Sequence, residues 1–110
     1  MASILKGYPV VNISNTVMTT LYTAPALTIS SLISVILSNK LTNSGTVSIQ
    51  IVRVGGLNTA NLVTNAPIPA GGALDAVVNK PIVLNPGDYI QAQASAASQT
   101  DVTVSVLEQA

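Results

Sequence analysis

The fold class of this chain is decided by residues 100–107, which read TDVTVSVL. Val102, Val104 and Val106 alternate with the polar residues between them. Successive side chains of a β-strand point to opposite faces, so this period of two predicts a strand with one buried face and one wetter face. The β-branched valines and threonines also favour extended backbone over helix. We therefore expect an antiparallel strand here.

The same alternation occurs in other segments of the chain. The sets that it places on one face are Val47, Ile49 and Ile51 within residues 46–54, Ile90, Ala92 and Ala94 within residues 88–95, and Val17, Thr19 and Leu21 within residues 17–22. In residues 88–95, Tyr89 shares the opposite face with Gln91 and Gln93. Each segment predicts a strand, and Tyr89 is expected to face outward.

Residues 26–38 fit two patterns. A helical stripe would contain Ile29, Leu32, Ile33, Ile36 and Leu37, whereas a strand would place Leu27, Ile29, Ile33, Val35 and Leu37 on one face. The β-branched, Ser and Thr content lowers helix propensity. The composition therefore favours a strand.

Turn residues separate these segments at residues 40–45, 55–58, 67–72 and 85–88. In the last of these, Pro86 presets φ and Gly87 can adopt the positive φ of a type II turn. Gly55-Gly56 predicts a hairpin or bulge. Asp88 follows the turn, and we expect its carboxylate to bind the turn amides rather than to act in catalysis.

Short strands separated by turns predict an all-β fold, a single antiparallel β-sandwich that is either jelly-roll-like or immunoglobulin-like. At 110 residues the chain matches one domain. Residues 1–15 contain Gly7, Pro9 and two Asn residues ahead of the first clear strand. We expect an N-terminal extended arm at residues 1–15 and the sandwich domain at residues 16–110.

The charge content is low, and this points to association with protein. Charged residues make up 7% of the chain, hydrophobic residues 48%, and the formal net charge is zero, so little repulsion keeps copies apart. The four cations, Lys6, Lys40, Arg53 and Lys80, are scattered, which argues against nucleic-acid and membrane partners. The sequence also lacks the pattern of a secretory signal, so synthesis in a cytoplasm is expected.

The residue types needed for common site chemistry are missing. Without His or Cys there is no serine–histidine nucleophile, thiolate or cysteine metal site. Asp75, Asp88, Asp101 and Glu108 remain, and no spacing motif pairs them or builds a calcium loop. We therefore predict no enzyme activity, no catalytic, cofactor-binding or metal-binding residue and no cofactor. An enzyme using paired carboxylates remains an alternative.

Several motifs resemble small virion proteins of tailed bacteriophages. They are YTAP at residues 22–25, Val47-Ser48-Ile49, PIPAG at residues 67–71, LNPGDYI at residues 84–90 and the Val-rich segment at residues 102–108. Together they span most of the chain. The turn Pro86-Gly87-Asp88 also occurs in unrelated jelly rolls.

This resemblance implies a non-enzymatic virion structural protein, foremost a capsid decoration or cement subunit that assembles on the particle. The implied partners are further copies of itself, as a trimer, and other virion proteins such as major capsid or tail proteins. The implied location is the virion, after synthesis in the host cytoplasm. The alternative is a tail or head fibre module that binds a receptor or glycan, with Tyr89 as the candidate contact. The binding residues are left unassigned.

Overall fold

The computed structural model describes residues 3–54, 58–76 and 82–109. These residues form strands and connecting turns. The strands are β1 (Ser3–Val10), β2 (Thr19–Thr23), β3 (Ile29–Asn39), β4 (Gly45–Arg53), β5 (Asn58–Ile68), β6 (Ala73–Asp75), β7 (Ile82–Leu84), β8 (Tyr89–Ala94) and β9 (Thr100–Gln109). No helix long and apolar enough to span a bilayer occurs among the described residues.

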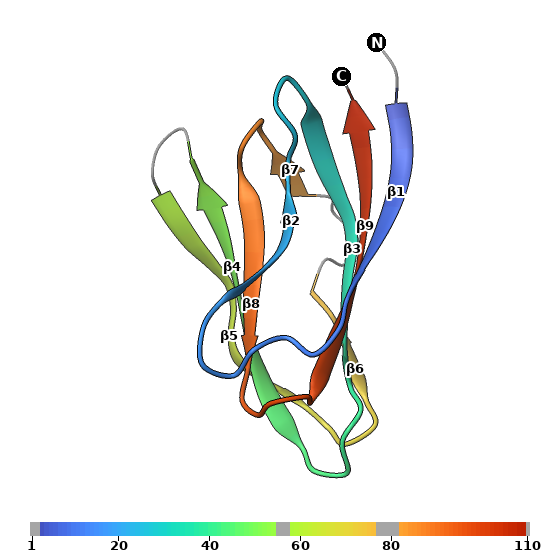
Figure 1. The fold of residues 1–110 in the computed structure, drawn as a ribbon, viewed down its shortest axis with the longest axis vertical. Helices are drawn as coiled ribbons and strands as arrows, with labels where there is room; N and C mark the ends of the chain where they lie inside the picture. Colours follow the sequence, from blue (N-terminus) through green and yellow to red (C-terminus); the bar gives the residue numbers. More distant parts are fainter. Residues whose placement is uncertain (1–2, 55–57, 77–81, 110) are drawn as a thin grey trace.

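The strands form two antiparallel sheets that pack against each other (Figure 1). Sheet A has the order β1-β9-β3-β6, with β7 also paired to β3, and sheet B has the order β2-β8-β4-β5. The pairs are nested along the chain: β4 with β5, β3 with β6 and β7, β2 with β8, and β1 with β9. A long hairpin rolled up in this way is a jelly roll. The predicted all-β sandwich is confirmed, and the strand order favours the jelly-roll form over the immunoglobulin-like form.

The core lies between the sheets and contains the predicted alternating sets. Val102, Val104 and Val106 of β9 are buried, and so are the inward residues of β4 and β8. Those residues are Val47, Ile49, Ile51, Ile90, Ala92 and Ala94. The alternating pattern was sufficient to predict these buried residues, because the three strands keep the alternation of inward and outward side chains along their length.

Residues 29–39 form a strand, as the composition favoured, but the predicted face is partly wrong. Leu32, Val35 and Leu37 are buried, whereas Ile29 and Ile33 are each 44% exposed. The register with β9 shifts between Leu32 and Ser34. A bulge inserts one extra residue and therefore reverses the alternation beyond it. Leu27, also predicted on the inner face, lies before the strand and is 90% exposed.

A second bulge changes β2. The register with β8 shifts between Thr20 and Tyr22, and the consecutive residues Leu21 and Tyr22 are both buried. The prediction had placed them on opposite faces. Val17 lies outside the strand and is 62% exposed, so the predicted strand began too early.

The segment expected as an arm contributes a strand to sheet A. Residues 3–10 form β1, which pairs with β9 from Ser3↔Gln109 to Val10↔Val102. Beyond β1, Ile13 is 1% exposed, and its backbone N–H donates to the carbonyl oxygen of Thr100 at 3.0 Å.

The predicted turn at residues 85–88 is confirmed. Gly87 has φ 89°, and the Asp88 N–H donates to the Asn85 carbonyl at 3.0 Å, as a type II turn requires. Residues 67–72 also turn, with Gly71 at φ 69°. The predicted hairpin at Gly55-Gly56 lies outside the described residues.

Candidate binding surfaces

The outer face of sheet B carries a row of side-chain amides. Gln91 Nε2 donates to Gln50 Oε1 at 2.9 Å, and Gln50 Nε2 donates to Asn61 Oδ1 at 3.0 Å. The three residues come from adjacent strands β8, β4 and β5, which the register places in one row. Tyr89 is half-buried and alternates with the buried Ile90, consistent with its predicted outward direction. This face is polar and neutral.

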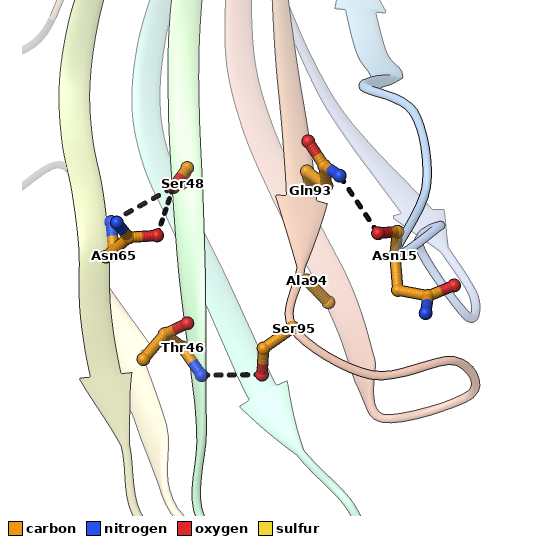
Figure 2. A pocket seen from close by; sticks show the side chains of 7 residues that line it. All are labelled: Asn15, Thr46, Ser48, Asn65, Gln93, Ala94 and Ser95. Atoms are coloured by element: carbon orange, nitrogen blue, oxygen red, sulfur yellow. Dashed lines mark hydrogen bonds between the residues drawn. The ribbon is translucent and has the colours of Figure 1, made fainter.

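A shallow cavity of about 260 Å³ opens at one end of this face (Figure 2). Its lining residues come from β4, β5, β8 and the β1–β2 and β8–β9 connections, and they are Asn15, Thr46, Ser48, Asn65, Gln93, Ala94 and Ser95.

Irregular backbone shapes this cavity. The β4–β5 register shifts between Val47 and Ile49, and Asn65 has φ 48°. The Asn65 N–H donates to Ser48 Oγ at 3.0 Å, which fixes the bulged segment against β4. On the opposite wall, Gln93 Nε2 donates to the Asn15 carbonyl at 2.9 Å.

The cavity offers hydroxyl and amide groups without a charged side chain among its lining residues. Within the described part of the chain, the Asn15 side-chain amide and the Thr46 hydroxyl make no hydrogen bond, and Gln93 Oε1 accepts none. These groups can bind a neutral hydroxylated ligand. They cannot supply acid–base or nucleophilic chemistry of the usual kinds.

Asp88 performs the structural role that the sequence predicted. Its carboxylate accepts hydrogen bonds from the backbone N–H groups of Asn85 and Val54, each at 3.0 Å, and pairs with Arg53 Nη1 at 3.0 Å. Burial raises the pKa of Asp88, but the hydrogen bonds from Arg53 and from the two amides outweigh it and hold the pKa below its usual value. This residue joins the 85–88 turn to the end of β4.

Asp101 and Glu108 have separate partners. Asp101 pairs with Lys40 at 3.0 Å and accepts from the Asn12 N–H at 2.9 Å; these two contacts lower its pKa, the Asn12 bond most. Glu108 pairs with Lys6 at 2.9 Å. The paired-carboxylate alternative required two of the four acids to share a site, whereas Asp88, Asp101 and Glu108 each pair with a different cation. Lys80 lies outside the described residues.

Glu108 also belongs to a buried polar cluster that the sequence did not reveal. The Tyr22 hydroxyl donates to Glu108 Oε2 and lies 2.7 Å from Ser30 Oγ. Hydrogen bonds from Tyr22 and then Lys6 hold the pKa of Glu108 below its usual value, while burial, reinforced by Glu108, raises the pKa of Tyr22. The cluster joins β1, β2, β3 and β9 and leaves Lys6 with its charge directed at Glu108.

The outer face of sheet A differs in character from that of sheet B. The register aligns Leu5 with Leu107, Leu107 with Ser31, and Ser31 with Val83, which forms one row across β1, β9, β3 and β7. The exposed members of this surface, here called the apolar face, are Leu5 (75%), Ile29 (44%), Ile33 (44%), Ile36 (38%) and Val83 (47%). All five are large aliphatic residues, and each leaves at least 38% of its surface accessible on the same side of the sheet.

Charged side chains of the same strands are turned away from most of this face. Lys6 and Glu108 have the strand parity of the inner face and pair with each other. Asp101 aligns with Ser38 toward the opposite end of sheet A, and Asp75 is paired with Ile36 and so lies at the edge of this face.

No protein-family model and no curated protein matches this sequence. Among solved structures, a chain of Bacillus endospore appendages, described as a novel family of disulfide-linked pili, is similar at 14% identity and TM-score 0.57. The match covers 96% of this chain and 86% of that one. A chain of infectious bursal disease virus, Gx strain, is similar at 14% identity and TM-score 0.52, and the match covers 96% of this chain and 32% of that one. At this identity the likeness is one of fold.

Proposed function

We propose that this protein is a non-enzymatic structural subunit of a virion, a capsid decoration or cement protein that self-associates through the apolar face of sheet A. The observation that carries the proposal is that face, which gathers five exposed aliphatic residues on one side of sheet A, with the nearby Lys6 and Glu108 paired to each other. Leaving such a surface in water is unfavourable, and covering it gains about 25 cal/mol per Å².

A second copy of the chain is the occupant that best fits this face. A specific interface has an apolar centre and a polar rim, and five exposed aliphatic residues beside hydroxyl-bearing residues such as Ser31 fit that arrangement. The central part of the face offers no charge that would select a charged partner, and the chain has zero net charge. The apolar surface of a second copy is therefore complementary in character.

Two further considerations support assembly on a virion. The motifs at residues 22–25, 67–71 and 84–90 resemble tailed-phage virion proteins, for which a trimer bound to capsid or tail proteins is the implied state. The fold is shared with a pilus chain and a virus chain, both components of multi-subunit structures. Because this chain has no Cys, its association cannot use the disulfide linkage described for those pili.

The test compares one substitution on each outer face. Leu5→Asp adds a charge to the apolar face, and Thr20→Asp adds the same charge to an exposed residue of edge strand β2 in sheet B. Sedimentation velocity at several concentrations should give a trimer for the wild type and for Thr20→Asp, and dissociation for Leu5→Asp. A monomeric wild type, or equal dissociation in both variants, refutes self-association through this face.

A companion experiment addresses the virion itself. The wild type should co-sediment with particles from the genome that encodes it, and genes for portal, capsid or tail proteins should lie beside its own. A self-associating protein that binds no such particle would refute the decoration role alone.

The polar cavity favours one alternative, a fibre module that binds a receptor glycan. Neutral hydroxyl and amide groups suit a sugar, and Tyr89 lies on the same outer face. Binding on a glycan array should then be lost on Gln93→Ala or Tyr89→Ala with the fold retained by circular dichroism. A blank array for the wild type removes this alternative.

A further inference from the structure

Leu27 occupies a position in the β2–β3 connection that does not suit leucine. The Thr28 N–H donates to the Pro25 carbonyl at 3.3 Å, and Leu27, at the third position of this turn, has φ 59°. Left-handed backbone is easily adopted by Gly and tolerated by Asn, but Cβ crowding makes it unfavourable for most other residues. A type II turn therefore usually has Gly or Asn where this chain has Leu27.

The Leu27 side chain contributes little buried apolar surface to the fold. It is 90% exposed, the highest value among the large apolar residues that the structure describes. A strained backbone carrying an almost fully exposed leucine is unfavourable for the isolated domain in two independent ways. Strained residues that persist in folded proteins cluster at functional contacts, where the surrounding structure holds them in place.

The surroundings of Leu27 do hold it in place. The Ala24 N–H donates to the Asp88 carbonyl at 2.8 Å, and the Gly87 N–H donates to the Ala24 carbonyl at 3.0 Å. Asp88 is itself fixed by Arg53 and two backbone amides, so the base of the turn is attached to the 85–88 turn. The β2–β3 connection, which contains Leu27, lies at the end of the molecule where β3 begins (Figure 1).

Leu27 also adjoins the apolar face. Ile29, two residues later, is the first residue of β3 and a member of that face. The residues from Ala24 to Ile33 carry no charge, so the apolar surface runs from the sheet to the turn without a charged interruption along the chain.

We propose that Leu27 is an anchor residue that packs into the apolar surface of a second copy of this chain. This inference rests on the proposed self-association and extends it by naming a residue retained for assembly at the expense of the fold. The neutral turn and the adjoining apolar face require a neutral apolar partner surface, which the second copy provides.

The experiment uses Leu27→Gly and Leu27→Asn, which both suit left-handed backbone and remove the apolar side chain. Each should raise the urea midpoint of unfolding, measured on dissociated protein at high dilution. Each should also weaken association by about tenfold or more in Kd, as expected for an interface anchor. Leu41→Asn is the control, because Leu41 lies in the β3–β4 turn and is 36% exposed; its Kd should stay within about twofold of the wild type.

The outcomes separate this inference from the proposed function. If Leu5→Asp dissociates the assembly but Leu27→Gly leaves the Kd unchanged, the role of Leu27 is refuted and self-association through the apolar face stands. If Leu27→Gly lowers the urea midpoint, Leu27 serves the fold and the inference is refuted. A monomeric wild type refutes both.

Discussion

Replacing Asp88 by Asn should destabilise the fold more than the same substitution at Asp101. The Asp88 side chain is 3% exposed and accepts three hydrogen bonds, from the Asn85 and Val54 amides and from Arg53. Asn has nearly the same shape but only one accepting oxygen. Its NH₂ group would face a backbone N–H or the Arg53 guanidinium, and one buried donor would lose its partner.

The expected cost is about 2–3 kcal/mol at pH 7. Hydrogen bonds to a charged group contribute about 1.5–3 kcal/mol, and breaking a fully buried ion pair costs about 3–5 kcal/mol. The Arg53 side chain is 37% exposed and can be hydrated when its partner is neutral, so the lower part of that combined range applies. Asp101, whose side chain is 39% exposed, pairs with Lys40, and Asp101→Asn should cost less than about 1 kcal/mol.

Urea unfolding followed by circular dichroism measures both variants. The folded-state pKa of Asp88 lies below its usual value of 3.8, so its stabilisation is present above pH 3.8 and is lost as pH falls through the folded-state pKa. The difference between the wild type and Asp88→Asn should therefore shrink below pH 3.8. Equal costs for the two variants at pH 7, or a difference for Asp88→Asn that stays constant in acid, would refute this reasoning.

Three further substitutions test the turns and the buried cluster. Gly45→Ala would place a methyl group against the buried Gln99 side chain and should cost about 1–3 kcal/mol in urea unfolding, with part of the loss recovered in a double variant that also carries Gln99→Ala. Gly87→Ala should cost about 1 kcal/mol because φ is 89°, and an unchanged melting curve would contradict the type II turn. Tyr22→Phe removes a hydrogen bond to the Glu108 carboxylate and should cost about 1–3 kcal/mol. It should also raise the Glu108 pKa in a carboxyl NMR titration; an unmoved pKa would exclude that bond.

Regular strands could be predicted from sequence because burial of one face imposes a period of two. Val104 and Ile49 follow it without interruption, and both are fully buried. The prediction failed where a bulge adds a residue, because no local signal marks the insertion. Ile33 was placed in the core for this reason, although it belongs to the apolar face.

Whether the candidate surfaces could be predicted from sequence depended more on strand topology than on local sequence pattern. The role of Asp88 was predictable because Pro86-Gly87 precedes it directly and fixes the turn that it binds. The cluster around Glu108 was not predictable, because its members come from four strands that only the order of the sheets brings together. The apolar face could not be predicted for the same reason, since its residues are far apart in sequence.

The nesting of strand pairs also bears on how the chain folds. Arg53 and Asn58 pair across a short connection, whereas Ser3 pairs with Gln109. Loop-closure entropy rises with the length enclosed, so forming the inner pairs first shortens the loop that each later pair must close. We expect pairing to spread outward from β4 and β5, with folding in about milliseconds to seconds, as is typical of all-β domains rich in distant contacts. The first strand of the chain, β1, would then be the last to pair.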